Sequence, residues 1–167
     1  MSSEPDTTPV RRLDDLVRRE AFTLAGAKGV FDQATQGDIP ALWPKLIAVL
    51  PLPGQVGGVT YGAMWPVDLA TGRFGYLAGV EVTGGAELPA DIERMTLAAQ
   101  TYVAFRIILD GGPLHPQMQA AMPKIWGEML PASGLKHAGA PDLEVYPHDF
   151  APNRKGAYID LHIPVEA

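Results

Sequence analysis

The feature that most constrains the fold of this chain is an internal repeat. When the sequence is aligned with itself at an offset of 83 residues, without gaps, distinctive residues coincide. Leu42-Trp43 falls on Ile125-Trp126, so two of the three tryptophans form a matched pair. The other matches are Ala21-Phe22 with Ala104-Phe105, Gly29 with Gly112, Pro40 with Pro123, and Val82 with Val165. Such a repeat predicts a fold that is built twice from one supersecondary unit.

Each half predicts the same order of elements. The first half reads as a strand over 21–28, an amphipathic helix from 38 to 50 that Pro51 stops, and a hairpin with strands over 57–64 and 73–82. The second half reads as a strand over 101–108, a helix over 117–130 that Pro131 closes, and a hairpin with strands over 143–146 and 157–165. We therefore predict an α+β fold, a duplicated β-α-β-β arrangement with pseudo-twofold symmetry.

The two halves are expected to merge into one antiparallel sheet with both helices on one face. A ligand cleft is then expected between the halves, because small molecules usually bind at such junctions. Residues 1–20 are expected to be a flexible N-terminal lead-in, and residues 21–167 a single domain. Its two repeats span about 21–83 and 104–166.

Composition excludes several classes of protein. With 47% apolar and 19% charged residues, 167 residues fit one globular domain. No apolar run is long enough for a membrane helix, and the first residues lack the order of a secretory signal, so we expect a cytoplasmic protein without a membrane partner. The net charge of -6 argues against a phosphate-binding surface. We expect no direct nucleic-acid partner.

No cofactor or metal is expected. The absence of cysteine excludes disulfides, thiolate metal sites and a cysteine nucleophile. His115, His137, His148 and His162 fall in no spacing that is typical of metal ligands. The paired glycines lack the sequence context of a phosphate-binding loop, and we interpret them as turns.

The alternation of the short strand at 143–146 predicts the lining of the cleft. Glu144 and Tyr146 share one face of this strand, while Leu143 and Val145 share the other. We expect the apolar pair to face the helices. Glu144 and Tyr146 are then expected to face the groove.

The repeat adds an aromatic neighbour to this glutamate. Tyr61 is the repeat mate of Glu144, so the two side chains are expected to converge, with Tyr76, Phe105 and Trp126 within reach. A carboxylate among aromatic rings is costly unless a bound cation compensates it or its pKa rises far enough for general acid or base chemistry. The alternative interpretation is that Glu144 is an exposed residue of an edge strand and the aromatic residues belong to the core.

Seven segments, in this order and spacing, resemble the gyrase-inhibitor-like (GyrI-like) effector-binding domains. They are Tyr61-Gly62, Tyr76-x-Ala78-Gly79-Val80-Glu81-Val82, Thr101-Tyr102-Val103-Ala104-Phe105, Ile125-Trp126, Leu130-Pro131-x-Ser133-Gly134, Asp142-x-Glu144-x-Tyr146 and Ile163-Pro164-Val165. The resemblance extends from about Phe22 to Val165. It implies a duplicated fold with a hydrophobic cleft and a central glutamate that binds drug-like, often cationic, molecules.

Position by position, the resemblance puts the cleft glutamate at Glu144 and its partner tyrosine at Tyr146. The ligand-binding aromatic residues that it implies are Tyr61, Tyr76, Phe105 and Trp126. Glu81 is a second candidate acid of the cleft. Two positions depart from the family pattern, which often has histidine where this chain has Ile107 and tryptophan where it has Met129.

Three functions fit this resemblance. We expect a stand-alone small-molecule-binding protein, related to the effector domains of AraC-type and MerR-type regulators, because only about twenty residues precede Phe22. The first alternative is a hydrolase of strained, cyclopropanoid electrophiles, in which Glu144 and Tyr146 are catalytic. The second alternative is an interaction protein that inhibits a larger partner such as DNA gyrase.

Overall fold

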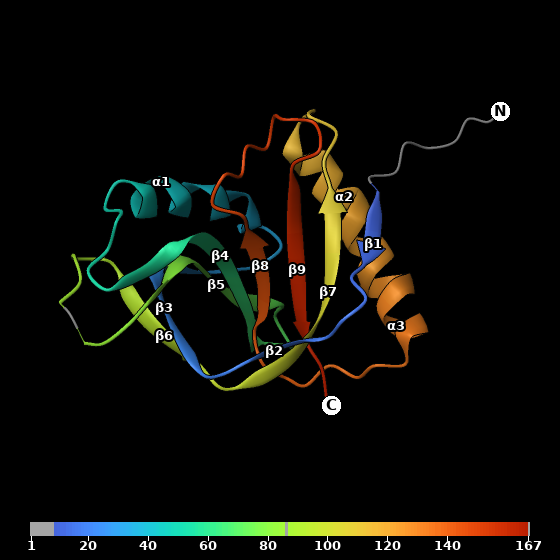
Figure 1. Cartoon of the computed structure of the whole chain (residues 1–167), viewed down its shortest axis with the longest axis horizontal. Coiled ribbons are helices and arrows are strands. Elements are labelled where there is room, and N and C mark those ends of the chain that lie inside the picture. Colours follow the sequence, from blue (N-terminus) through green and yellow to red (C-terminus); the bar gives the residue numbers. More distant parts are fainter. Residues whose placement is uncertain (1–8, 86, 167) are drawn as a thin grey trace.

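The computed structural model describes residues 9–85 and 87–166 (Figure 1). Its strands are β1 (Val10–Arg12), β2 (Val17–Arg19), β3 (Phe22–Phe31), β4 (Gln55–Asp68), β5 (Arg73–Val82), β6 (Glu93–Leu97), β7 (Gln100–Ile108), β8 (Asp142–Tyr146) and β9 (Tyr158–Pro164). They form one sheet in the order β1-β7-β9-β8-β4-β5-β3-β6, with β2 also paired to β7. Every paired strand is antiparallel to its neighbour.

The order of the six central strands shows the duplication. From the middle of the sheet outward, the second half runs β8, β9, β7 and the first half runs β4, β5, β3. The two halves meet where β4 pairs with β8, from Thr60–Tyr146 to Met64–Asp142. These five cross-strand pairs are centred on Gly62 and Glu144. The predicted duplicated α+β fold with pseudo-twofold symmetry is therefore confirmed.

The helices differ from the predicted ones at their ends. The first helix is α1 (Leu42–Ile47), which continues from a 3₁₀ turn over Gln36–Ala41. The second begins as α2 (Leu114–Lys124). It continues through a π-helical turn over Ile125–Met129 into α3 (Leu130–Ser133). Pro40 lies inside the 3₁₀ turn, so the regular helix starts later than predicted. Pro131 does not stop the second helix, because it lies in the first turn of α3, where no N–H is required. Gly134 ends α3 at a φ of 74°.

Both helices cover the same face of the sheet, as predicted. On the first half, Leu42 and Leu46 of α1 pack in one core cluster with Ala25 and Ala78 of the strands. On the second half, α2 and the π-helical turn contribute Ala121 and Ile125 to a core that contains Phe105, Ile159 and Leu161.

The opposite face of the sheet is also buried. A third cluster joins residues of β3, β4, β5, β6, β7 and β8, namely Phe22, Leu24, Tyr61, Ala63, Leu77, Leu97, Tyr102 and Leu143. The sheet curls around this cluster, because β6 at one end of the strand order is joined to β7 near the other end by Ala98 and Ala99 alone. The expectation that Leu143 and Val145 face the helices is therefore wrong. They face the third cluster.

Residues 10–19 form two short strands along β7, where the sequence led us to expect a flexible lead-in. From the end of β2, Arg19 reaches across the third cluster and donates hydrogen bonds to Tyr61 and Glu81, both at 3.0 Å. Its guanidinium also lies over the ring of Phe22. Residues 1–8 lie outside the described part of the chain. Among the described residues, no helix is long and apolar enough to cross a membrane.

Candidate functional site

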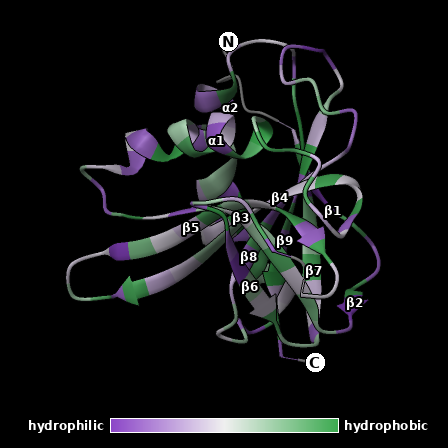
Figure 2. Ribbon diagram, turned by 90° about the vertical axis from the view of Figure 1, so that its left-hand side faces the viewer, coloured by the Kyte–Doolittle hydropathy of each residue, from purple (hydrophilic) through white to green (hydrophobic). Residues whose placement is uncertain are grey.

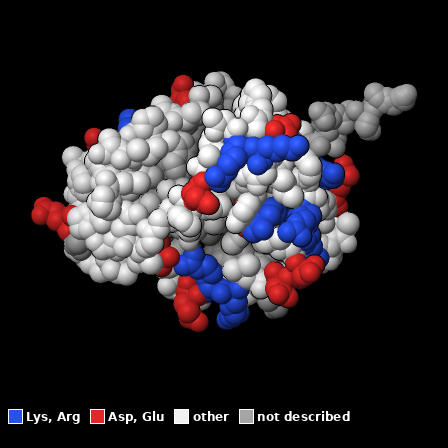
Figure 3. Space-filling model, turned by 45° about the horizontal axis from the view of Figure 1, so that its top comes forward, with Lys and Arg blue, Asp and Glu red and all other residues white. Residues whose placement is uncertain are grey.

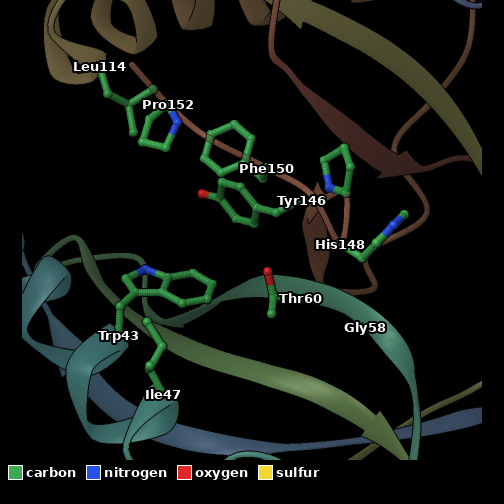
Figure 4. Close-up of a pocket in the computed structure, with 10 residues that line it drawn as sticks. Trp43, Ile47, Gly58, Thr60, Leu114, Tyr146, His148, Phe150 and Pro152 are labelled. Atoms are coloured by element: carbon green, nitrogen blue, oxygen red, sulfur yellow. The ribbon is translucent and has the colours of Figure 1, made fainter. Parts of the chain in front are cut away.

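A cavity of about 440 Å³ lies between α1 and the connection from β8 to β9 (Figure 4). It is on the face of the sheet that carries the helices. Its lining comes from α1, the start of β4, the first residue of α2, and the end of β8 with the loop that follows. The lining residues are Trp43, Ile47, Gly58, Thr60, Leu114, Tyr146, Pro147, His148, Phe150 and Pro152. From the sequence we expected the ligand groove on the face away from the helices, but that face is filled by the third cluster, and this cavity lies on the face that carries the helices.

Aromatic rings meet edge to face along one side of the cavity. The ring centroids of Trp43 and Tyr146 are 5.2 Å apart with an interplanar angle of 78°. Tyr146 is also 5.2 Å from Phe150, at 62°. Trp43 further contacts Tyr76, at 6.5 Å and 72°. Since edge-to-face pairs are favourable beyond their buried area, these rings hold one another in place and form a preorganised wall.

Behind this wall lies Glu144, which is only 8% exposed. Its Oε1 accepts a hydrogen bond from the phenol of Tyr76 at 2.6 Å and another from the phenol of Tyr146 at 2.8 Å. Among the described residues, Oε2 has no hydrogen-bond partner, and no lysine, arginine or histidine forms an ion pair with this carboxylate. The negative charge of Glu144 is therefore shared with two phenols and is not neutralised.

The room for this hydrogen-bonded group comes from Gly62. Gly62 is the cross-strand partner of Glu144. A Cβ at this position would overlap the hydroxyl of Tyr76 and the carboxylate of Glu144. A side chain on β4 would thus occupy the space in which the carboxylate and the phenol meet.

Burial is the largest influence on the pKa values of Glu144, Tyr76 and Tyr146. It raises the pKa of the Glu144 carboxyl above its ordinary value, while the hydrogen bonds from Tyr76 and Tyr146 act in the opposite direction. Burial, followed by the neighbouring carboxylate, raises the pKa of both phenols well above the ordinary value. The phenols of Tyr76 and Tyr146 are therefore neutral hydrogen-bond donors near neutral pH, and Glu144 is the group of the three with the lowest pKa.

Tyr61 does not join Glu144. Since Gly62 is opposite Glu144, its neighbour Tyr61 points to the other face of the sheet. There it packs against Phe22, at 6.1 Å between ring centroids, and accepts a hydrogen bond from Arg19. The predicted convergence of Tyr61 and Glu144 is wrong, because the offset of 83 residues is one residue too long at this strand.

Three other predicted residues also lie away from the cavity. Phe105 is fully buried in the core beneath α2. Trp126 is 37% exposed and packs against the ring of His137, at 6.0 Å. Glu81 is paired with Arg19 on the opposite face of the sheet. Of the predicted set, the structure brings together Glu144, Tyr76 and Tyr146.

Two aromatic residues of the wall were absent from the predicted site. Trp43 had a usable signal, since it is one of the two matched tryptophans and lies on the predicted helix of the first half. Phe150 had none, because it follows β8 in a loop without periodicity, and only the fold brings it against Tyr146.

The fold is that of an effector-binding domain of the gyrase-inhibitor-like type. Residues 15–165 match the Cass2 family, described as integron-associated effector binding protein. The match covers most of the chain. The chain belongs to this family.

Relatives of known sequence or structure agree with this assignment. The transcriptional regulator BrlR of Pseudomonas aeruginosa is 29% identical over 156 residues, which is 90% of this chain and 54% of BrlR, so the chain spans about half the length of that relative. The structure of SAV2435 bound to tetraphenylphosphonium has a TM-score of 0.73 at 20% identity and covers 92% of this chain and 93% of that one. An integron cassette protein from Vibrio cholerae has a TM-score of 0.63 at 18% identity, covering 94% and 99%. These structures share the fold.

Proposed function

We propose that the protein captures bulky aromatic cations in the cavity between α1 and the β8–β9 connection. The observation that carries this proposal is the buried carboxylate of Glu144, whose only hydrogen-bond partners among the described residues are two phenols. An ionised carboxylate without a positive partner loses hydration worth several kcal/mol on burial. A bound cation compensates this loss, and aromatic faces attract the same cation by about 0.5 to 2 kcal/mol each.

The position of the carboxylate selects the kind of cation. Tyr146 lines the cavity, whereas Glu144 lies behind it. The charge of Glu144 therefore acts on a ligand across the phenol, without a direct hydrogen bond. This electrostatic attraction across the phenol favours a cation whose charge is delocalised or shielded by apolar groups. A primary ammonium would lose its hydration in the cavity and gain no hydrogen-bond acceptor in exchange. Tetraphenylphosphonium, the ligand in the SAV2435 structure, is such a cation.

The surroundings of the cavity support an apolar ligand. A volume of about 440 Å³ lies within the usual range of small-molecule pockets. In the view of Figure 3, the left half of the molecule, where α1 lies in Figure 1, shows few charged side chains, and Lys and Arg gather on the right half. Within the described chain, the lining of the cavity contains no Asp, Glu, Lys or Arg, so the buried Glu144 behind Tyr146 is the source of attraction for a cation.

The test is calorimetric titration with tetraphenylphosphonium and with triphenylphosphine oxide, a neutral compound of similar shape. Glu144→Gln should weaken binding of the cation by roughly 10- to 100-fold and leave binding of the oxide nearly unchanged. Asp149→Asn is the matched control, because Asp149 is an exposed carboxylate in the loop beside the cavity. It should change neither affinity. Equal affinity of the wild type and Glu144→Gln for tetraphenylphosphonium would contradict the proposal.

A further inference from the structure

A second cavity, of about 370 Å³, lies at the far end of the β4–β8 pair. It is formed by the tip of the β4–β5 hairpin, which projects from the body of the molecule (Figure 2), and by the first residue of β8. The lining residues are Met64, Trp65, Pro66, Asp68, Leu69, Gly72, Arg73, Phe74 and Asp142. Beyond the Met64–Asp142 pair β8 has not yet begun, so the edge of β4 from Trp65 onward faces this cavity and not another strand.

The pseudo-twofold axis relates this cavity to the first one. A half turn centred on the middle of the β4–β8 pair exchanges Thr60 with Asp142 and Tyr146 with Met64. Thr60 and Tyr146 line the first cavity, whereas Asp142 and Met64 line the second. The same half turn exchanges the β8–β9 connection, which closes the first cavity, with the β4–β5 connection. The two cavities therefore lie at opposite ends of the β4–β8 pair and are related at the strands, although helix residues line only the first.

The second cavity differs from the first in where it holds its acid. Asp142 is itself a lining residue, whereas Glu144 lies behind Tyr146. One oxygen of Asp142, Oδ1, is 2.8 Å from Nε2 of His137. Because Nδ1 of His137 accepts the backbone N–H of Gly139, a neutral ring carries its proton on Nε2 and donates it to Asp142. Within the described part of the chain, Oδ2 has no hydrogen-bond partner.

The remaining lining residues suit a small aromatic ring. Trp65, Phe74 and Met64 supply an apolar surface, and Leu69 at the hairpin tip is 86% exposed. An exposed leucine of this kind on a projecting hairpin provides an apolar contact that nothing in the described chain covers. Asp68 and Arg73 bring one charge each of opposite sign. Asp142, whose Oδ2 has no partner within the described part of the chain, is therefore an acid of this cavity that can accept a further hydrogen bond.

The geometry points to a second, separate binding site for a small aromatic amine, whose protonated nitrogen donates a hydrogen bond to Asp142 while its ring lies against Trp65, Phe74 and Met64. A hydrogen-bonding ammonium is favoured here because the acceptor lies on the wall. A quaternary ammonium is favoured less, since it has no N–H to donate. The two cavities thus divide organic cations according to whether the charged group can donate a hydrogen bond.

The test is a titration of isotope-labelled protein with tryptamine, followed through backbone amide shifts, with and without saturating tetraphenylphosphonium. Saturable shifts are expected at residues 64–74 and around Asp142, and they should persist when tetraphenylphosphonium is present. Asp142→Asn, in which the amide oxygen can still accept the bond from His137, should weaken tryptamine binding at least about tenfold. N,N,N-trimethyltryptammonium should bind several-fold more weakly than tryptamine, and Asp149→Asn should leave tryptamine binding unchanged.

Three outcomes would overturn this inference. They are shifts confined to the residues around Tyr146 and Phe150, unchanged affinity in Asp142→Asn, and no saturable binding of tryptamine. The amide spectrum also reports whether each variant is folded, so a misfolded variant is recognised in the same experiment. The location of the shifts in the wild type shows by itself whether tryptamine binds in the second cavity. Failure of tetraphenylphosphonium to bind would contradict the function proposed for the first cavity and leave the tryptamine result standing.

Discussion

Gly62 lies directly opposite Glu144 in the β4–β8 pair, and its missing side chain leaves the space in which the carboxylate meets the phenols of Tyr76 and Tyr146. The pair is also the centre of the pseudo-twofold arrangement. In an exact duplication the same residue type would stand on both strands. The two halves have instead diverged: the second half has Glu144 at this position, and the first half has Gly62, which leaves space for the carboxylate.

Replacement of Gly62 by alanine should therefore damage the site and the fold together. The new Cβ overlaps the Tyr76 hydroxyl and the carboxylate, so at least one hydrogen bond to Glu144 must break or the strands must separate. We expect the free energy of unfolding to fall by about 1 to 3 kcal/mol, measured by urea denaturation. Gly37→Ala is the control, since a Cβ there meets no atom within 4 Å. A loss of stability no greater than that of this control would contradict the role given to Gly62.

The pH dependence of cation binding should follow the titration of Glu144. The ionised form attracts the ligand and the protonated form does not. Since burial raises the pKa of this carboxyl, affinity for tetraphenylphosphonium should begin to fall at a higher pH than for an exposed glutamate, and then by up to about tenfold per pH unit. Calorimetry at a series of pH values measures this slope. Glu144→Gln should give a flat profile, and the same slope in both proteins would assign the effect to another group.

The fold was predictable because its helices and longer strands have clear local sequence patterns, and these patterns occur twice in the chain. The hydrophobic spacing around Trp43 and the alternation over 73–82 each identify an element, and the repeat of both in the second half identifies the architecture. The strands β1, β2 and β6 were not predicted. They are three to five residues long and pair only along the outer parts of the sheet, so they carry too few alternating residues to be distinguished from loops.

The site was predictable only in part, for a reason that Tyr61 makes clear. The ungapped offset matches the helices, yet the pairing of β4 with β8 makes Gly62, and not Tyr61, the equivalent of Glu144. A shift of one residue moves a side chain to the other face of a sheet. Alternation could not correct this error, because both faces are buried, so Leu143 and Glu144 are each enclosed on their own side.

His162 should destabilise the protein in mild acid. It lies on β9 beside Tyr102, and burial, with smaller contributions from Arg19 and Arg106, lowers its pKa from 6.5 to about 4. Because the folded state holds this histidine neutral, the unfolded state binds the proton more readily. Stability should therefore be full above pH 6.5 and decline as the pH falls toward about 4, by up to about 3 kcal/mol.

The measurement is urea denaturation of the wild type and His162→Gln between pH 4 and 7, with the imidazole followed by NMR. The glutamine variant should lose less stability over this range, because it has no ring to protonate. His115→Gln serves as the control for removal of a histidine elsewhere. An NMR titration of His162 with its midpoint near 6.5 would refute the assignment.

The last prediction concerns catalysis, which the sequence left open as an alternative to binding. A general acid or base must lie within hydrogen-bond reach of the reacting group or of one bridging water. Glu144 does not line the cavity, and its Oε1 already accepts two phenol hydrogen bonds. The pKa of the Tyr146 phenol is raised, so this residue is a poor source of phenolate. We therefore expect the wild type to hydrolyse a cyclopropane-bearing electrophile no faster than the Glu144→Gln variant, in an assay of product formation by liquid chromatography. A wild-type rate above the rate in buffer, reduced by about 10² to 10⁴ in Glu144→Gln, is the loss expected of a catalytic acid or base and would make the protein a hydrolase.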